Sequence, residues 1–219
     1  MRLIIYVMFL LYPFSLLPAA SGGKKEKNLS DEELMTLVQK QTFRYFWDYG
    51  HPVSGLARER SNGNDDIVTI GGSGFGVMAI IVGAERGFVT REQAAERMLK
   101  IVNFLNDKNT DSYHGIWAHW INGQSGETIS FSRKDDGADL VESAFMFEGL
   151  LAAHQYFNKD NQVERRIRAL INDLWRQAEW NWFTKGGEDV LYWHWSPNNG
   201  WSMNHQIKGH NECHITYIL

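Results

Sequence analysis

Apolar positions recur at helical spacing along most of the chain and predict six helices. Two of these helices begin at capping boxes, in which a Ser or Thr is followed three residues later by Glu or Gln: Ser30 with Glu33, and Thr90 with Gln93. The spacing and the stop signals place the helices over residues 30–50, 72–85, 90–106, 137–157 and 162–183, and from about residue 209 onward.

Three stretches between the helices lack helical periodicity. Residues 51–69 are rich in Gly, Asn, Asp and Arg and are expected to form a loop. Residues 112–133 alternate between two faces, and the turn signal Asn122-Gly123 predicts a small hairpin whose second strand covers Thr128–Phe131. Residues 190–204 form an aromatic-rich loop with its own turn.

Consecutive antiparallel helix pairs with long loops at one end are typical of an all-α fold, either an α/α toroid or an α-solenoid. Three such pairs would make half of a closed toroid of six hairpins. The last apolar run, residues 210–219, contains no stop signal, so we expect the domain to be incomplete at its C-terminal end. An open half-toroid would expose apolar helix faces and is expected to self-associate.

The N-terminal segment has the pattern of an export signal. Arg2 precedes an apolar run over residues 3–17, and small residues follow at 18–22. A membrane anchor is the alternative, but the run is short for a bilayer span. We therefore expect a signal peptide over residues 1–20, a leader over 21–28 and one domain over 29–219 that is secreted or periplasmic, with no membrane association after cleavage.

Composition excludes several functional classes. The 219 residues carry a net charge of −4, which argues against a nucleic-acid partner because such proteins need a basic surface. The single cysteine, Cys213, excludes a disulfide scaffold and any multi-cysteine metal site. Nine Trp, eight Tyr and twelve Phe exceed what core packing requires, so aromatic rings are candidates for ligand contacts. No cofactor is expected.

A carboxylate cluster begins the predicted helix over residues 137–157. Asp139 and Glu142 are three residues apart and share one helix face, which continues as an apolar stripe. Asp135 lies just before the helix. Complementation of the helix dipole is the simpler explanation, and it suits Asp135 better than Glu142, which lies deeper in the helix. A catalytic or binding cleft explains all three.

A second candidate is Glu212, at the predicted start of the last helix after the aromatic loop. A carboxylic acid among apolar neighbours has a raised pKa, which suits a general acid. One alternative is a metal site formed by His210, Cys213 and His214, although this segment lacks the His-Glu-x-x-His order of a zinc-protease helix. The other alternative is a simple helix cap.

Aromatic and histidine side chains precede both acidic helix starts. Trp117 and His119 come before the carboxylate cluster, and Trp193 and Trp195 come before the second candidate. Aromatic faces stack on sugar rings and histidines bond hydroxyls, so we predict a carbohydrate cleft. Some of these rings are expected to cover the core instead. Arg58 could also reach a substrate, although loop arginines are usually solvated.

The glycine-rich stretch over residues 71–76 precedes helix-forming sequence. It lacks the Gly-Lys-Ser/Thr of a phosphate-binding loop and the context of a dinucleotide-binding fingerprint. Close helix packing, or a tight loop beside the site, accounts for these glycines.

Four segments together resemble the glucoamylase-like proteins of glycoside hydrolase family 144, and the resemblance extends from Leu29 to Leu219. The segments are Gln41–Asp48 (QTFRYFWD), Gly55–Arg60 (GLARER), Asp136–Glu142 (DGADLVE) and Asn211–His214 (NECH). The resemblance implies an (α/α)6 toroid and an endo-β-1,2-glucanase that inverts the anomeric centre and releases sophorose-type oligosaccharides.

The resemblance also implies roles for individual residues. Glu212 matches the proposed general acid, and Asp135, Asp139 and Glu142 match acidic residues that line the cleft. The general base would lie beyond residue 219, so the chain alone is expected to be inactive. Inverting enzymes separate their two carboxyl groups by roughly 6.5–9.5 Å, and Asp139 and Glu142, one helical turn apart, are expected to be too close for that pair.

Other functions are compatible with the sequence. The main alternative is a glycan-binding protein without catalysis, which would bind β-glucan or gluco-oligosaccharides and release no reducing ends. A glucoamylase-like hydrolase of another linkage, a polysaccharide lyase and a metal-dependent toroid enzyme are further alternatives. They differ in their products and in their response to a chelator.

Overall fold

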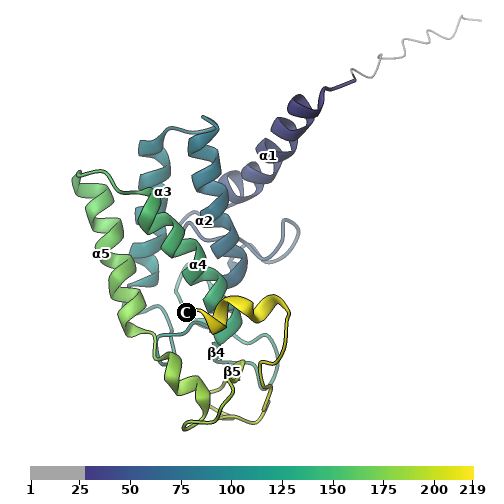
Figure 1. Ribbon diagram of the computed structural model, residues 1–219, viewed down its shortest axis with the longest axis vertical. Helices are drawn as coiled ribbons and strands as arrows, with labels where there is room; N and C mark the ends of the chain where they lie inside the picture. The colour runs from purple at the N-terminus through teal and green to yellow at the C-terminus, as the bar shows by residue number, and fades with distance from the viewer. Residues whose placement is uncertain (1–27) are drawn as a thin grey trace, which may run out of the picture.

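The computed structural model describes residues 28–219, so the predicted signal peptide and all but the last residue of the leader lie outside the described residues. Helices dominate this part, and short strands connect them (Figure 1). The helices are α1 (Asp31–Asp48), α2 (Ile70–Glu85), α3 (Arg91–Leu105), α4 (Leu140–Tyr156) and α5 (Gln162–Gln177), with 3-10 helices η1 (Trp180–Thr184) and η2 (Glu212–Tyr217). The strands are β1 (Ile67–Thr69), β2 (Trp120–Asn122), β3 (Thr128–Ile129), β4 (Ala138–Asp139) and β5 (His194–Trp195).

Both predicted capping boxes are confirmed. The Ser30 main-chain N–H donates to Glu33 at 2.9 Å, and the Ser30 hydroxyl accepts from the Glu33 N–H at 3.3 Å. Thr90 and Gln93 make the same reciprocal pair at the start of α3. These contacts satisfy main-chain donors that the first helical turn leaves unpaired.

Two helical hairpins, α2–α3 and α4–α5, form the body of the fold. Helix α2 packs against α4 and α3 packs against α5, while α1 contacts α2 and projects away from the body (Figure 1). The prediction of a sixth α-helix from about residue 209 is wrong, because this segment forms the short 3-10 helix η2 against α4. The fold is therefore mainly helical, with two complete hairpins in the described residues instead of three.

The glycine-rich stretch lets α2 and α4 approach each other closely. A Cβ atom at Gly74 would lie 2.2 Å from the main-chain oxygen of Phe145, and one at Gly149 would lie 2.5 Å from the Gly74 oxygen. Close helix packing, one of the two explanations from the sequence, is confirmed.

Two small antiparallel sheets lie at one end of the helices. Strand β2 pairs with β1 and β3, in a register that places Trp120 opposite both Thr69 and Ile129. The predicted hairpin is confirmed with shorter strands. Strand β1 lies in the stretch predicted as loop. Strands β4 and β5 pair Asp139 with His194, which brings segments 55 residues apart together.

Two helix boundaries, the start of α4 and the end of α5, lie three or more residues from the predicted positions. Helix α4 begins at Leu140, because residues 138–139 pair with β5 instead of continuing the helix. Helix α5 ends at Gln177, because the Glu179 N–H donates to the carbonyl of His114 in another loop. In both places a long-range contact replaces helical hydrogen bonding.

Large apolar side chains are exposed on α1 and α2, as expected for an open arrangement of helices. They include Met35, Val38, Phe75 and Met78, each more than two-fifths exposed. Within residues 28–219, no helix combines the length and apolar character needed to cross a bilayer.

Candidate active site

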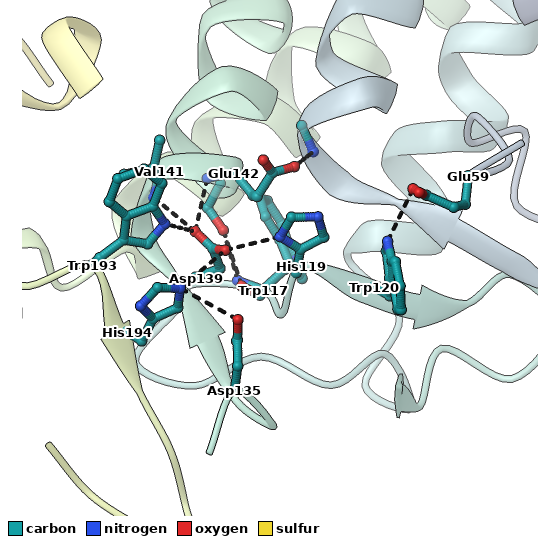
Figure 2. A network of polar contacts seen from close by, with 12 residues as sticks. Glu59, Trp117, His119, Trp120, Asp135, Asp139, Val141, Glu142, Trp193 and His194 are labelled. Carbon is teal, nitrogen blue, oxygen red and sulfur yellow. Dashed lines mark hydrogen bonds and ion pairs between the residues drawn. The ribbon is translucent and has the colours of Figure 1, made fainter. Parts of the chain in front are cut away.

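Asp139 is a buried carboxylate at the N-cap of α4, with only 1% of its surface exposed (Figure 2). Its Oδ1 accepts hydrogen bonds from the main-chain N–H groups of Val141 at 3.1 Å and Glu142 at 3.0 Å. The same oxygen accepts from the indole Nε1 of Trp193 at 2.8 Å. Three donors therefore fix one oxygen of this side chain.

The other oxygen of Asp139 faces two histidines. His119 Nδ1 lies 3.2 Å from Oδ2, and His194 Nε2 lies 3.6 Å from it. An ionised carboxylate can only accept, so the facing nitrogen of His119 carries a proton. His194 Nε2 also lies 3.4 Å from Oδ2 of Asp135, which is 5% exposed. His194 thus bridges two buried carboxyl groups from β4 and the preceding turn.

Charge pairing controls ionisation in this cluster. Burial alone would raise the pKa of Asp139, but the contacts with His119 and His194 outweigh it and lower that pKa to about 2. Burial alone would lower the pKa of His119, but the bond to Asp139 and the surrounding acidic charge raise it. The charged forms of Asp139 and the half-buried His119 therefore stabilise each other.

The pKa values of Asp135 and Glu142 are raised, in contrast to that of Asp139. Burial raises the pKa of each carboxyl group, and the negative charge of Asp139 raises both further. Glu142 Oε2 accepts a hydrogen bond at 2.9 Å from the N–H of Gly71, where a Cβ atom would lie only 2.3 Å from that oxygen. A Cβ atom at residue 71 would therefore push the Glu142 carboxyl group aside. The alternative explanation for the glycine-rich stretch, a tight loop beside the site, is wrong, because residues 71–76 lie within α2.

A polar and aromatic wall continues beyond Glu142 (Figure 2). The indole of Trp120 donates to Glu59 at 3.0 Å, and the negative charge of Glu59 also raises the pKa of Glu142. The exposed ring of Phe131 lies 4.3 Å from that of His119. Glu59 and the pairing role of His194 could not be predicted from the sequence, because both depend on contacts between distant loops.

The structure brings together five predicted residues: Asp135, Asp139, Glu142, His119 and Trp193. Their catalytic and binding roles stay predictions. Trp117 does not join them as a sugar-contacting surface, because it is 1% exposed and packs against Phe147 with ring centroids 5.2 Å apart. That expectation is wrong, and the ring belongs to the core.

Trp195 and Arg58 lie outside this cluster. The ring of Trp195 contacts those of Tyr113 and His114, on the side of β5 away from Asp139. Arg58 pairs with the exposed Asp65 at 3.3 Å. The expected contact of each with a substrate stays a prediction.

Glu212 is the first residue of η2 and is exposed, so the apolar surroundings expected for it are wrong. The next residue, Cys213, is buried, and its pKa is raised to about 11 by burial and then by the charges of Glu212 and Asp139. Helix η2, which begins at Glu212, packs against α4. Its role as general acid stays a prediction.

The metal site considered at residues 210–214 is not formed. Cys213 is turned into the core, whereas His210 and His214 are exposed. Among residues 28–219, the group whose ligand atoms converge is Asp135, Asp139 and His194, within 4.8 Å of one another. Two carboxylates and an imidazole are ligand types that could hold a divalent cation.

Comparisons with known proteins find similarity to glucoamylase-like proteins and to enzymes that act on β-1,2-glucans. It is 81% identical to a glucoamylase-like protein from Bacteroides uniformis, with a TM-score of 0.87 over 88% of this chain and 47% of that protein. It is 48% identical to the endo-β-1,2-glucanase of Chitinophaga pinensis, crystallised with sophorotriose and glucose, with a TM-score of 0.82 over 87% of this chain and 46% of that enzyme.

A third relative is the exo-β-1,2-glucooligosaccharide sophorohydrolase (non-reducing end) of Parabacteroides distasonis. It is 48% identical over 193 residues, which are 87% of this chain and 26% of that protein. No family model matches the chain. The chain spans about half the length of the two structural relatives above, and it is a homologue within the glucoamylase-like, β-1,2-glucanase family of the glycoside hydrolase 144 type.

Proposed function

We propose that this chain carries one wall of the active site of an exported, inverting endo-β-1,2-glucanase. The observation that carries the proposal is the cluster of three buried or half-buried carboxyl groups, Asp135, Asp139 and Glu142, with His119 and Trp193 at the start of α4. Relatives that act on β-1,2-glucans, and one crystallised with sophorotriose, support this substrate.

The carboxyl groups have different tasks in this proposal. Asp139 stays ionised and holds His119 and Trp193 in place. Asp135 and Glu142 have raised pKa values, so they keep a proton to higher pH than an ordinary carboxyl group and can donate hydrogen bonds to a sugar. Glu212 protonates the leaving oxygen, as the family resemblance implies. We propose that the carboxylate activating the water comes from the part of the relatives' fold that this chain does not span.

A hybrid enzyme tests the proposal directly. The matching segment of the Bacteroides uniformis protein is replaced by this chain, an exchange that the 81% identity makes conservative. Hybrid and parent are incubated with β-1,2-, β-1,3-, β-1,4- and α-1,4-glucans, and the products are separated by chromatography. Proton NMR of the first product gives its anomeric configuration.

The proposal predicts β-1,2-linked oligosaccharides of several lengths from the β-1,2-glucan, with an initial α-anomer because the bond is inverted. Release of single glucose units from an α-1,4-glucan would instead show a glucoamylase. An initial β-anomer would contradict the inverting mechanism.

A glycan-binding protein without catalysis is the second candidate, because the aromatic rings of Trp193 and Phe131 adjoin the carboxylate cluster and could bind a sugar by themselves. Calorimetry of the unfused chain with sophorotriose distinguishes the two. Binding by the chain together with a hybrid that releases no reducing ends supports the binding protein.

A further inference from the structure

A second aromatic surface lies behind the two-stranded sheet that bears part of the carboxylate cluster. Successive residues of a strand point to opposite faces. In β5, His194 faces Asp135 and Asp139, whereas Trp195 faces the other way and contacts the edge of Trp182 with ring centroids 6.1 Å apart. The surface around Trp182 is therefore separate from the candidate active site.

Trp182 lines a pocket of about 500 Å³ beside η1, which lies within the roughly 300–1,000 Å³ usual for small-molecule sites. A second indole, Trp201, lines the same pocket, with its ring centroid 6.3 Å from that of Trp182 and tilted by 33°. The remaining lining residues are Asn181, Thr184, Lys185, Gly186 and Gly187.

One face of the Trp182 ring packs against a neighbouring side chain. His114 stacks on it with centroids 3.7 Å apart and planes 14° from parallel. A 2.9 Å contact between His114 Nδ1 and Glu179 fixes the histidine in turn. Trp182 nevertheless remains 38% exposed. An aromatic ring that is fixed on one side and open on the other is preorganised for a stacking ligand, because binding costs little side-chain entropy.

The polar groups of the pocket favour an uncharged, hydroxyl-rich ligand. Of the seven described residues that line it, none is acidic and only Lys185 is basic. The Lys185 amino group already donates to Asn204 at 2.9 Å and lies over the ring of Tyr192, so its charge is partly engaged. Asn181, which is exposed, offers an amide at the rim.

We propose that the pocket between Trp182 and Trp201 is an accessory glycan site that stacks one glucosyl ring of a β-1,2-glucan chain. The choice of this glucan rests on the proposed function, whereas the ring-stacking chemistry rests on the pocket itself. Such a site would hold the polymer on the enzyme between cleavage events, at a position separate from the carboxylates.

The indole N–H signals of tryptophan report on both sites in one NMR titration of the chain. Trp182→Phe removes and thereby assigns one signal, and Trp193→Phe assigns the signal of the indole bonded to Asp139. Sophorotriose and glucose are then titrated into the unaltered chain. Saturable shifts of the Trp182 signal are expected, with a dissociation constant that Glu142→Gln leaves unchanged.

In the variants the indole signal of Trp201, assigned with Trp201→Phe, reports binding, because Trp201 lines the same pocket. Trp182→Ala should weaken this binding about tenfold, whereas Trp182→Phe should retain most of it because a ring remains. A Trp182 signal that does not move with any β-1,2-oligosaccharide overturns the accessory site. So does a shift that Glu142→Gln abolishes, because the two sites would then be one. A Trp193 signal that does not move while Trp182 responds argues against the proposed function and leaves the accessory site supported.

Discussion

Replacing Asp139 by Asn removes the buried negative charge that organises the candidate active site while keeping an oxygen for the α4 cap. The lowering of the Asp139 pKa from 3.8 to about 2 corresponds to about 2 kcal/mol of stability at pH values where the unfolded chain is also ionised. Loss of this ion pair should therefore lower the free energy of unfolding by about 2 kcal/mol.

The free energy of unfolding that Asp139→Asn removes depends on pH, and it decreases both at low pH and at high pH. A lowered carboxyl pKa gives stability that is present above the unfolded value and disappears as pH falls toward about 2. The raised pKa of His119 gives stability that is present below its unfolded value, near 6.5, and disappears as pH rises through the folded value. The difference between wild type and Asp139→Asn should thus be greatest between about pH 4 and pH 6.5.

Urea unfolding followed by circular dichroism between pH 3 and pH 8 measures this difference. Asp160→Asn is the control, because Asp160 pairs with Arg165 at an exposed position, and its loss should change stability by less than about 1 kcal/mol. A difference that is the same at pH 3 and pH 5, or an Asp139→Asn variant as stable as wild type at pH 5, would refute the ion pair.

Three further predictions concern the core and the catalytic assignment. Arg91→Met leaves the buried Glu164, whose pKa Arg91 helps to lower to about 2, without its partner, and should cost about 3–5 kcal/mol in urea unfolding. Gly74→Ala should lower the melting temperature far more than Gly72→Ala, because its Cβ would meet the main chain of α4 and not only the side-chain methyl group of Thr69. In the hybrid enzyme, Glu212→Gln should lower kcat at least about 100-fold with little change in glucan binding; near-normal turnover would reject the general-acid role.

Local signals in the sequence located the helices well. The capping boxes at Ser30 and Thr90 involve only neighbouring residues, so their pattern could be recognised and the structure confirms them. The start of α4 was misplaced because Asp139 pairs with His194, a contact across 55 residues that no local pattern reveals.

Only part of the candidate site could be predicted, because the rest of it also depends on contacts between distant segments. The spacing of Asp139 and Glu142 indicated a carboxylate cluster, but not that one carboxyl is ionised and the other has a raised pKa. That difference depends on His119 and Gly71, which distant segments supply. Trp117 and Trp193 look alike in the sequence, yet only tertiary packing buries the first and directs the second toward Asp139.

The most direct test of the proposed active site compares the hybrid enzyme with its Glu142→Ala form, which removes the proposed hydrogen-bond donor, on linear β-1,2-glucan. We expect the hybrid to release β-1,2-linked oligosaccharides and the variant to release them at least about 100-fold more slowly. Both should keep the same melting temperature. Equal rates for the two enzymes, or no product from β-1,2-glucan while another glucan is cleaved, would contradict the assignment of this carboxylate cluster to β-1,2-glucan hydrolysis.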